Sequence, residues 1–181
     1  ETMTPGVVPT RFRDLAEPAV GVDAKTVVKD SVVVDFTANP DFSQVESDEP
    51  QVTTNQRFEV FFPERRPFFL ENANVFQPPI NLLFTRRIVD PAVGGRVTGK
   101  FGRYTLGALV TDDLGNAGVG AVRASRDLGS QSAVGVIYTA RESAESSNRV
   151  GGVDGRLSLG SHWSASLQSV VSHSRSLEKM Q

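Results

Sequence analysis

The chain has 181 residues, a net charge of −2 and no cysteine. The balanced charge argues against a nucleic-acid partner, and the lack of cysteine excludes disulfides, thiolate metal sites and a cysteine nucleophile. No apolar run approaches the roughly 20 residues that a membrane-spanning helix needs. The chain opens on Glu1 and ends within a patterned stretch, so we expect it to be a piece of a longer protein.

The first part of the sequence changes from polar to strand-like. Residues 1–19 are polar and punctuated by proline, which predicts a linker or the end of an upstream domain. Residues 20–94 are expected to hold the first strands and a plug or loop segment. In Ser31–Thr37 one face carries Val32, Val34 and Phe36, and the other carries Val33, Asp35 and Thr37.

Residues Asn39–Phe76 form an unusual segment. Two phenylalanine pairs, Phe61-Phe62 and Phe68-Phe69, flank the charged stretch Pro63–Pro67. A proline at each end of this stretch prevents a regular helix through it and removes two hydrogen-bond donors. We therefore expect an irregular inward loop or plug. Residues Asn81–Arg87 are predicted to be another short extended piece.

Residues 95–181 alternate regularly and predict a β-meander that is incomplete at its C-terminal end. The predicted strands are Gly95–Gly102, Tyr104–Thr111, Ala117–Ser125, Gln131–Arg141, Arg149–Gly160 and Trp163–His173. Tight turns are expected to alternate with longer polar loops, at Asp112–Asn116, at Glu142–Asn148 and after His173. The fold class is all-β: an antiparallel up-and-down meander, part of a transmembrane outer-membrane β-barrel.

Each predicted strand has one apolar face and one polar face. Val97, Gly99 and Phe101, for example, alternate with Arg96, Thr98 and Lys100. A soluble β-sandwich also alternates in this way. Aromatic residues beside the tight turns (Phe101, Tyr104, Trp163), with Tyr138 near a longer loop, favour the membrane alternative as two interface girdles. The register of residues 117–125 stays open, because Arg123 shares a face with Val119 and Ala121.

The acidic cluster Asp41, Glu46, Asp48 and Glu49, with Asp35 upstream, offers hard oxygen ligands for a cation. Its spacing is not that of an EF-hand loop, so solvated or lumen-facing charge is the preferred interpretation. A glycosidase-type carboxylate pair within this cluster remains an alternative. The two histidines, His162 and His173, suggest neither a catalytic triad nor a zinc site. No cofactor or metal is expected.

A second group, Glu64, Arg65, Arg66 and Glu71, lies beside four phenylalanines. It predicts either a ligand-binding or gating element or a plug held by ion pairs and aromatic packing. We prefer the plug, since opposite charges close in sequence tend to neutralise one another. Further basic residues are expected on the lumen wall: Arg86, Arg87, Arg96 and Lys100.

Three stretches of sequence resemble an uncharacterised bacterial outer-membrane barrel family. They are Asn39–Glu46, Phe61–Asn72 and Phe84–Ile88, continued by Gly99-Lys100 and Leu106-Gly107. The resemblance implies that this chain holds the junction and first strands of a barrel. It also implies a family-9 carbohydrate-binding module before residue 1 and further strands after residue 181. The family brings no established catalytic residues.

We therefore predict an outer-membrane protein of a Gram-negative bacterium that takes part in binding or passage of carbohydrate or another nutrient. Lumen charges (Arg96, Lys100, Asp154, Arg156) would set selectivity. The expected partners are outer-membrane lipid and carbohydrate. One alternative is a surface hydrolase that uses carboxylates near Asp41–Glu49. The other is a structural or secretion-associated barrel.

Overall fold

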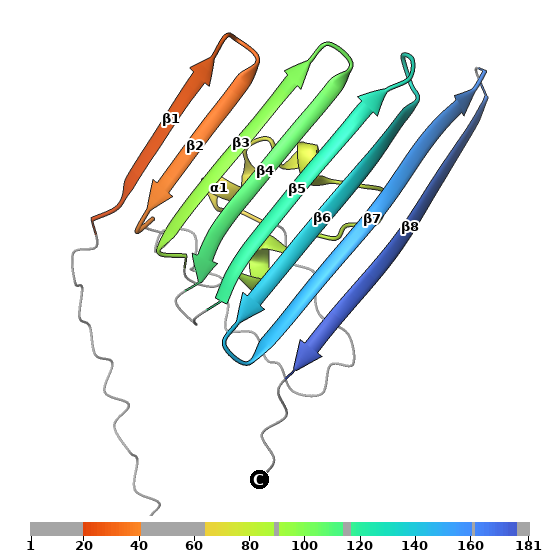
Figure 1. Ribbon diagram of the computed structural model, residues 1–181. Helices are drawn as coiled ribbons and strands as arrows, with labels where there is room; N and C mark the ends of the chain where they lie inside the picture. Colours follow the sequence, from red (N-terminus) through yellow and green to blue (C-terminus); the bar gives the residue numbers. More distant parts are fainter. Residues whose placement is uncertain (1–19, 41–63, 89–90, 114–116, 161, 177–181) are drawn as a thin grey trace, which may run out of the picture.

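Eight antiparallel strands follow one another along the chain and pair in the same order (Figure 1). The computed structural model describes residues 20–40, 64–88, 91–113, 117–160 and 162–176. The strands are β1 Val22–Val28, β2 Val32–Ala38, β3 Val93–Phe101, β4 Tyr104–Asp113, β5 Ala117–Asp127, β6 Ala133–Ser143, β7 Ser146–Leu159 and β8 Trp163–Ser176. The all-β meander predicted from the sequence is confirmed. Within the described residues the sheet is not closed, because β1 and β8 each pair on one side only.

One predicted loop is wrong, and the other two begin later than predicted, because β4 continues to Asp113 and β8 to Ser176. The sequence suggested a long polar connection over Glu142–Asn148, but only Ala144 and Glu145 separate β6 from β7. The ladder continues through this region, with Glu142 opposite Ser147. The chain's polarity here reflects exposed strand ends, because serine and asparagine can occupy a ladder whose side chains meet water.

The segment between β2 and β3 lies against one face of the sheet (Figure 1). Its described part, residues 64–88, is called the docked segment below. It holds a short helix α1 (Pro67–Leu70) and two 3₁₀ turns, η1 (Ala73–Phe76) and η2 (Thr85–Arg87). Proline fits at α1's first position, where its missing N–H has no helical partner. The extended piece predicted for Asn81–Arg87 is wrong at its end, because η2 occupies it.

The two faces of the sheet differ in polarity, as the alternation predicted, although the inner face also buries apolar side chains such as Leu109 and Ile137. The inner face, which the docked segment covers, buries Asp35, Arg96 and Thr98. The outer face exposes their strand neighbours, including Phe36 and Val97, at 45% and 43% of their surface. No helix among the described residues is long and apolar enough to cross a membrane.

The structure also determines the register of residues 117–125. Val119, Ala121 and Arg123 are buried and face inward, whereas Val122 is 55% exposed on the outer face. An apolar pair and an arginine share the inner face because each has its own partner there. Val119 and Ala121 belong to the apolar cluster beneath the docked segment, and Arg123 has an ion-pair partner.

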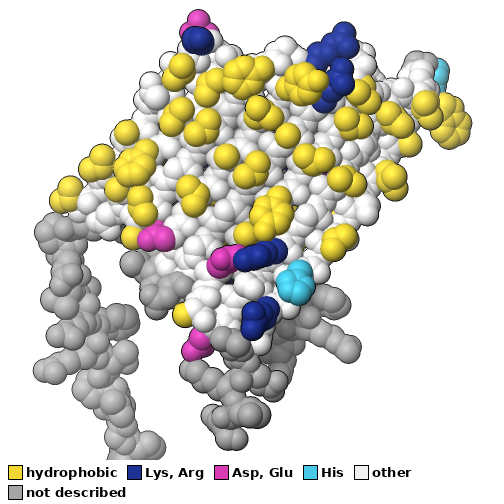
Figure 2. All heavy atoms as spheres, in the orientation of Figure 1, with side chains coloured by type: hydrophobic (Ala, Val, Ile, Leu, Met, Phe, Trp, Pro, Cys, Tyr) yellow, Lys and Arg dark blue, Asp and Glu magenta, His cyan; other side chains and the backbone are white. Residues whose placement is uncertain are grey.

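Apolar side chains spread over the outer face, and charged ones gather near its two ends (Figure 2). Three of the four aromatic residues predicted for the membrane interfaces, Phe101, Tyr104 and Trp163, flank the tight turns and are exposed. Tyr138 is exposed on the same face, but it lies in the middle of β6 rather than at its end.

Glycines on the inner face make room for the docked segment. A Cβ added to Gly94 would lie 2.9 Å from the Phe68 ring. At Gly107 it would lie 2.6 Å from Val75 Cγ1, and at Gly152 it would lie 2.9 Å from Leu82 Cδ1. Real side chains do not approach so closely, so these three strands carry glycine where apolar side chains of the segment seat. A small apolar cluster (Phe69, Phe76, Ile88, Leu109, Val119, Ala121) completes the contact.

Candidate functional site

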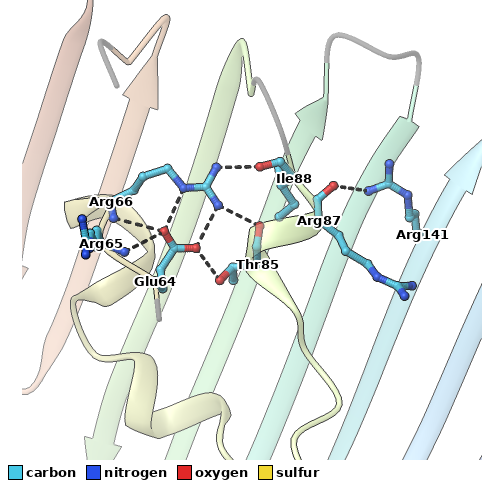
Figure 3. Close-up of polar contacts among 7 residues, drawn as sticks. All are labelled: Glu64, Arg65, Arg66, Thr85, Arg87, Ile88 and Arg141. Carbon is cyan, nitrogen blue, oxygen red and sulfur yellow. Dashed lines mark hydrogen bonds and ion pairs between the residues drawn. The ribbon is translucent and has the colours of Figure 1, made fainter. Parts of the chain in front are cut away.

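The charged stretch predicted to act as a plug forms a cluster of hydrogen bonds and an ion pair around Arg66 (Figure 3). Such a cluster, centred on one buried arginine, is called a knot below. The Arg66 guanidinium donates to both carboxylate oxygens of Glu64, each at 2.8 Å. It also donates to the backbone carbonyls of Ile88 at 2.6 Å and Thr85 at 2.8 Å. Arg66 Cζ lies 4.4 Å from the centre of the Phe69 ring. The side chain is buried and joins the two ends of the docked segment.

Glu64 is held in its ionised form. Burial alone would raise the pKa of this carboxyl group, but hydrogen bonds from the Arg66 side chain, the Thr85 hydroxyl and the Arg66 backbone N–H outweigh burial and lower the pKa from 4.5 to about 2. The Thr85 hydroxyl donates to Glu64 Oε2 at 2.7 Å. A carboxylate with such a low pKa is a poor general acid and a weak general base near neutral pH.

A second knot joins the sheet to the docked segment. Arg96 on β3 donates to Asp35 Oδ2 on β2 through Nε at 3.1 Å and Nη2 at 2.8 Å. Its Nη1 donates to the backbone carbonyls of Phe68 and Glu71, at the end of α1. Glu71 in turn accepts from Lys25 on β1 at 2.6 Å. Arg96 is buried beneath the segment, so its guanidinium does not line an open surface.

Further polar pairs lie along the inner face. Arg123 on β5 makes a two-pronged ion pair with Asp154 on β7, at 2.7 and 2.8 Å. The intervening Gly135 on β6 leaves space for it, because a Cβ there would lie 2.9 Å from Arg123 Nη2. Arg141 pairs with Asp113 at 3.1 Å. These pairs are mostly shielded from water, and each charge is compensated.

The last strand also contacts the docked segment. The Gln168 side chain accepts from the Ile80 backbone N–H at 2.5 Å and donates to the Ile80 carbonyl at 3.1 Å. An amide side chain can satisfy both polar groups of one residue in this way. The docked segment is therefore fixed to both ends of the sheet, at β1 by Lys25 and at β8 by Gln168.

The predicted site residues fall into two groups. Glu64, Arg66, Arg96 and Glu71 all belong to contacts that hold the docked segment, and the plug role stays a prediction. Lys100 lies on the inner face but is exposed and pairs with Asp127 at 3.0 Å. The remaining predicted residues are placed as follows: Arg65 donates its backbone N–H to Glu64, Arg86 and Arg87 lie in η2, and Arg156 is exposed on the inner face of β7.

The acidic cluster Asp41, Glu46, Asp48 and Glu49 lies outside the described residues. The cation-site and glycosidase hypotheses therefore stay predictions. Within the described ranges, no three histidine or acidic side chains come together as a metal-binding group. The carboxylates of the two knots, Glu64 and Asp35, each have a basic partner, so their arrangement suits structural support rather than proton transfer.

Sequence reasoning missed the partners of several predicted residues. The Arg123–Asp154 pair joins β5 to β7 across the intervening β6, and Gln168 contacts Ile80, 88 positions away in the sequence. The alternation indicates which side chains face inward, but it does not specify which inward residues meet. The inward glycines were the available signal, since glycine within a strand marks close approach of another group.

Comparison with known proteins bears on the family and on nothing finer. Residues 12–101 match a family described as a domain of unknown function (DUF5916). The match runs through β1, β2 and the docked segment and ends with β3. No curated protein and no solved structure matches the chain. The preceding carbohydrate-binding module stays a prediction. Through residues 12–101 the chain belongs to this uncharacterised family, as its sequence motifs suggested.

Proposed function

We propose that this chain is part of an outer-membrane β-barrel that takes part in binding or passage of carbohydrate or another nutrient at the cell surface. The observation that carries the proposal is the reversed polarity of the sheet. Its outer face is apolar and exposed, whereas its inner face, beneath the docked segment, carries buried charged and hydroxyl side chains beside a small apolar cluster. Transmembrane barrels have this arrangement, with apolar residues toward lipid and polar residues toward the interior.

A soluble β-sandwich explains these observations less well than a membrane barrel does. Such a fold packs its apolar strand faces together and leaves polar faces in water. Here the outer face leaves Val97, Val110 and Val122 at least 43% exposed, while Arg96 and Thr98 are buried. Soluble proteins seldom expose so continuous an apolar patch unless it contacts a partner or a membrane.

The nutrient part of the proposal is supported by the uncovered end of the inner face. On β7 and β8 this face carries exposed polar side chains, namely Arg156, Ser164 and Ser166. Hydroxyl and guanidinium groups are suited to hydrogen bonding with sugars or anionic solutes. The docked segment, held by its two knots, would act as the internal element that narrows the lumen beside this surface.

The deciding experiment is conductance of the full-length natural protein in planar lipid bilayers, with and without oligosaccharides. We expect steady conductance that sugars block. The matched variants are Arg156→Gln, on the uncovered inner face, and Arg175→Gln, on the outer face near the C-terminal end of β8. Only Arg156→Gln should change ion selectivity or sugar block.

Two results would count against the proposal. A protein that stays out of every bilayer would contradict the membrane assignment. A protein that inserts stably but never conducts or binds sugar would contradict the nutrient role and favour a structural barrel. The hydrolase alternative makes a separate prediction: substituting Asp41, Glu46 and Asp48 together would abolish turnover of a glycan substrate and leave conductance intact.

A further inference from the structure

Two arginines are neighbours of Tyr104 at the tight-turn end of the sheet, Arg126 across the ladder and Arg103 along the chain. Arg126, next to the end of β5, is the ladder partner of Tyr104 at the start of β4. Arg103 immediately precedes Tyr104, and its carbonyl accepts from the Asp127 backbone N–H at 2.8 Å. Arg126 Cζ lies 5.3 Å from the centre of the Tyr104 ring. Figure 2 shows Lys and Arg side chains gathered at this edge of the apolar surface.

These two arginines carry charge that no neighbouring carboxylate compensates. Both are exposed, and within the described ranges neither forms an ion pair. The nearest acid in sequence, Asp127, faces inward and pairs with Lys100 at 3.0 Å. The buried arginines of the inner face and the docked segment, Arg66, Arg96 and Arg123, differ from this pair because each has a carboxylate partner. The arginine pair is therefore available to an anion from outside the protein.

Apolar surface begins directly next to the arginine pair. Along β4 and β5 the outward residues after Tyr104 and Arg126 are Leu106, Ala108, Ala124 and Val122. Farther along the same strands the outer face has an apolar hollow of about 500 Å³, with Gly95, Ala108 and Gly120 among its lining residues. Since a strand rises about 3.4 Å per residue, Ala108 lies roughly 14 Å from Tyr104. An anion that fits this surface would carry a hydrocarbon chain.

We propose that Arg103, Tyr104 and Arg126 bind the phosphate head group of an anionic phospholipid, whose acyl chain follows the outer face toward the hollow. Arginine pairs with phosphate oxygens through two parallel hydrogen bonds, and a tyrosine ring suits the boundary between head groups and acyl chains. This inference rests on the proposed function, because it requires the outer face to meet lipid. It adds a head-group class and a location at the tight-turn end.

The test uses the full-length natural protein, purified in detergent and offered phosphatidylglycerol or phosphatidylcholine. Native mass spectrometry counts the lipids retained. We expect phosphatidylglycerol to be retained and phosphatidylcholine to be released. In the double variant R103Q/R126Q retention should need roughly tenfold more lipid, since each basic residue near an anionic surface contributes about a fivefold effect at most. The control K29Q/R175Q removes the same charge at two other exposed positions and should retain phosphatidylglycerol as the unchanged protein does.

The outcomes separate this inference from the proposed function. Equal retention by both double variants, in a protein that still inserts in bilayers, would overturn the lipid site and leave the membrane assignment intact. Competition by inorganic phosphate at millimolar concentration would also overturn it, because the acyl chain would then contribute nothing. A protein that enters neither lipid would overturn both proposals. Both arginines are exposed, so heat-modifiable migration in gels should confirm that R103Q/R126Q folds.

Discussion

The two faces of this sheet are stabilised in opposite ways. On the inner face charges such as Arg96 and Arg123 are buried, and each pairs with a carboxylate. On the outer face valine, leucine and aromatic side chains are exposed. The inner face therefore depends on specific contacts with the docked segment, whereas the outer face depends on whatever surrounds the protein.

One alternating pattern therefore produces both a face with specific contacts to the docked segment and a face with a nonspecific apolar surface. The inner face holds the docked segment in one position, because its glycines make room for Phe68 and Val75 and its ion pairs fix the segment. The outer face is apolar but offers no comparable specific contacts, which would suit the fluid acyl chains of the proposed bilayer. The following changes test this contrast.

The largest effect is expected from Arg96→Ala. Removing this guanidinium leaves the buried Asp35 carboxylate and two backbone carbonyls without a partner, which should lower the free energy of unfolding by about 3–5 kcal/mol. Urea unfolding in detergent micelles would measure it. The control is Lys100→Ala, on the same strand and face, whose exposed pair with Asp127 contributes about 1 kcal/mol or less. Equal losses in the two variants would contradict the contrast between buried and exposed pairs.

The next effect concerns the outer face. If the outer face meets lipid as proposed, Val122→Arg places a charge against it and should lower the stability of the folded protein in a bilayer by about 2–4 kcal/mol. Ser166→Arg, on the uncovered inner face, should cost far less. Unfolding titrations in lipid vesicles would compare them. If Val122→Arg changes stability by less than about 0.5 kcal/mol, the outer face meets water, as an ordinary exposed position does.

A smaller effect is expected at a glycine that receives the docked segment. Gly107→Ala forces a methyl group to within 2.6 Å of Val75 and 2.9 Å of the Phe76 ring. Overpacking of this kind costs about 1–3 kcal/mol and should loosen the segment. Limited proteolysis after Arg65 or Arg86 would detect the loosening. Gly118→Ala meets nothing within 4 Å and should leave the proteolysis rate unchanged.

A further effect concerns acid. The pKa of Glu64 is about 2 in the folded protein, below its ordinary value of 4.5. Its contribution to stability is therefore complete above pH 4.5 and is lost as the pH falls from 4.5 toward 2. The stability difference between the natural protein and Glu64→Gln should shrink over this window. A difference that stays constant from pH 6 to pH 2.5 would show that the Arg66 knot does not depend on the charge of Glu64.

The sequence predicted the parts of the structure that depend on local pattern. Alternation gave the strands and their faces, and the charges of Glu64 and Arg66 lie close enough in sequence to suggest their pairing. Glu71 shows where this reasoning ends, because its side chain reaches Lys25 and Arg96 rather than the neighbouring arginines. Such contacts depend on the register of distant strands and on how the docked segment lies, and a single sequence specifies neither.

The contact between Gln168 and Ile80 has a consequence for the order of folding. The docked segment is synthesised before β3 to β8, yet part of it is held by the last of these strands, 88 residues later. Closing so long a loop is entropically costly and slow compared with pairing adjacent strands. We therefore infer that the hairpins assemble first and that residues 77–84 settle onto the sheet only when β8 arrives. β8 thus fixes this part of the docked segment against the sheet.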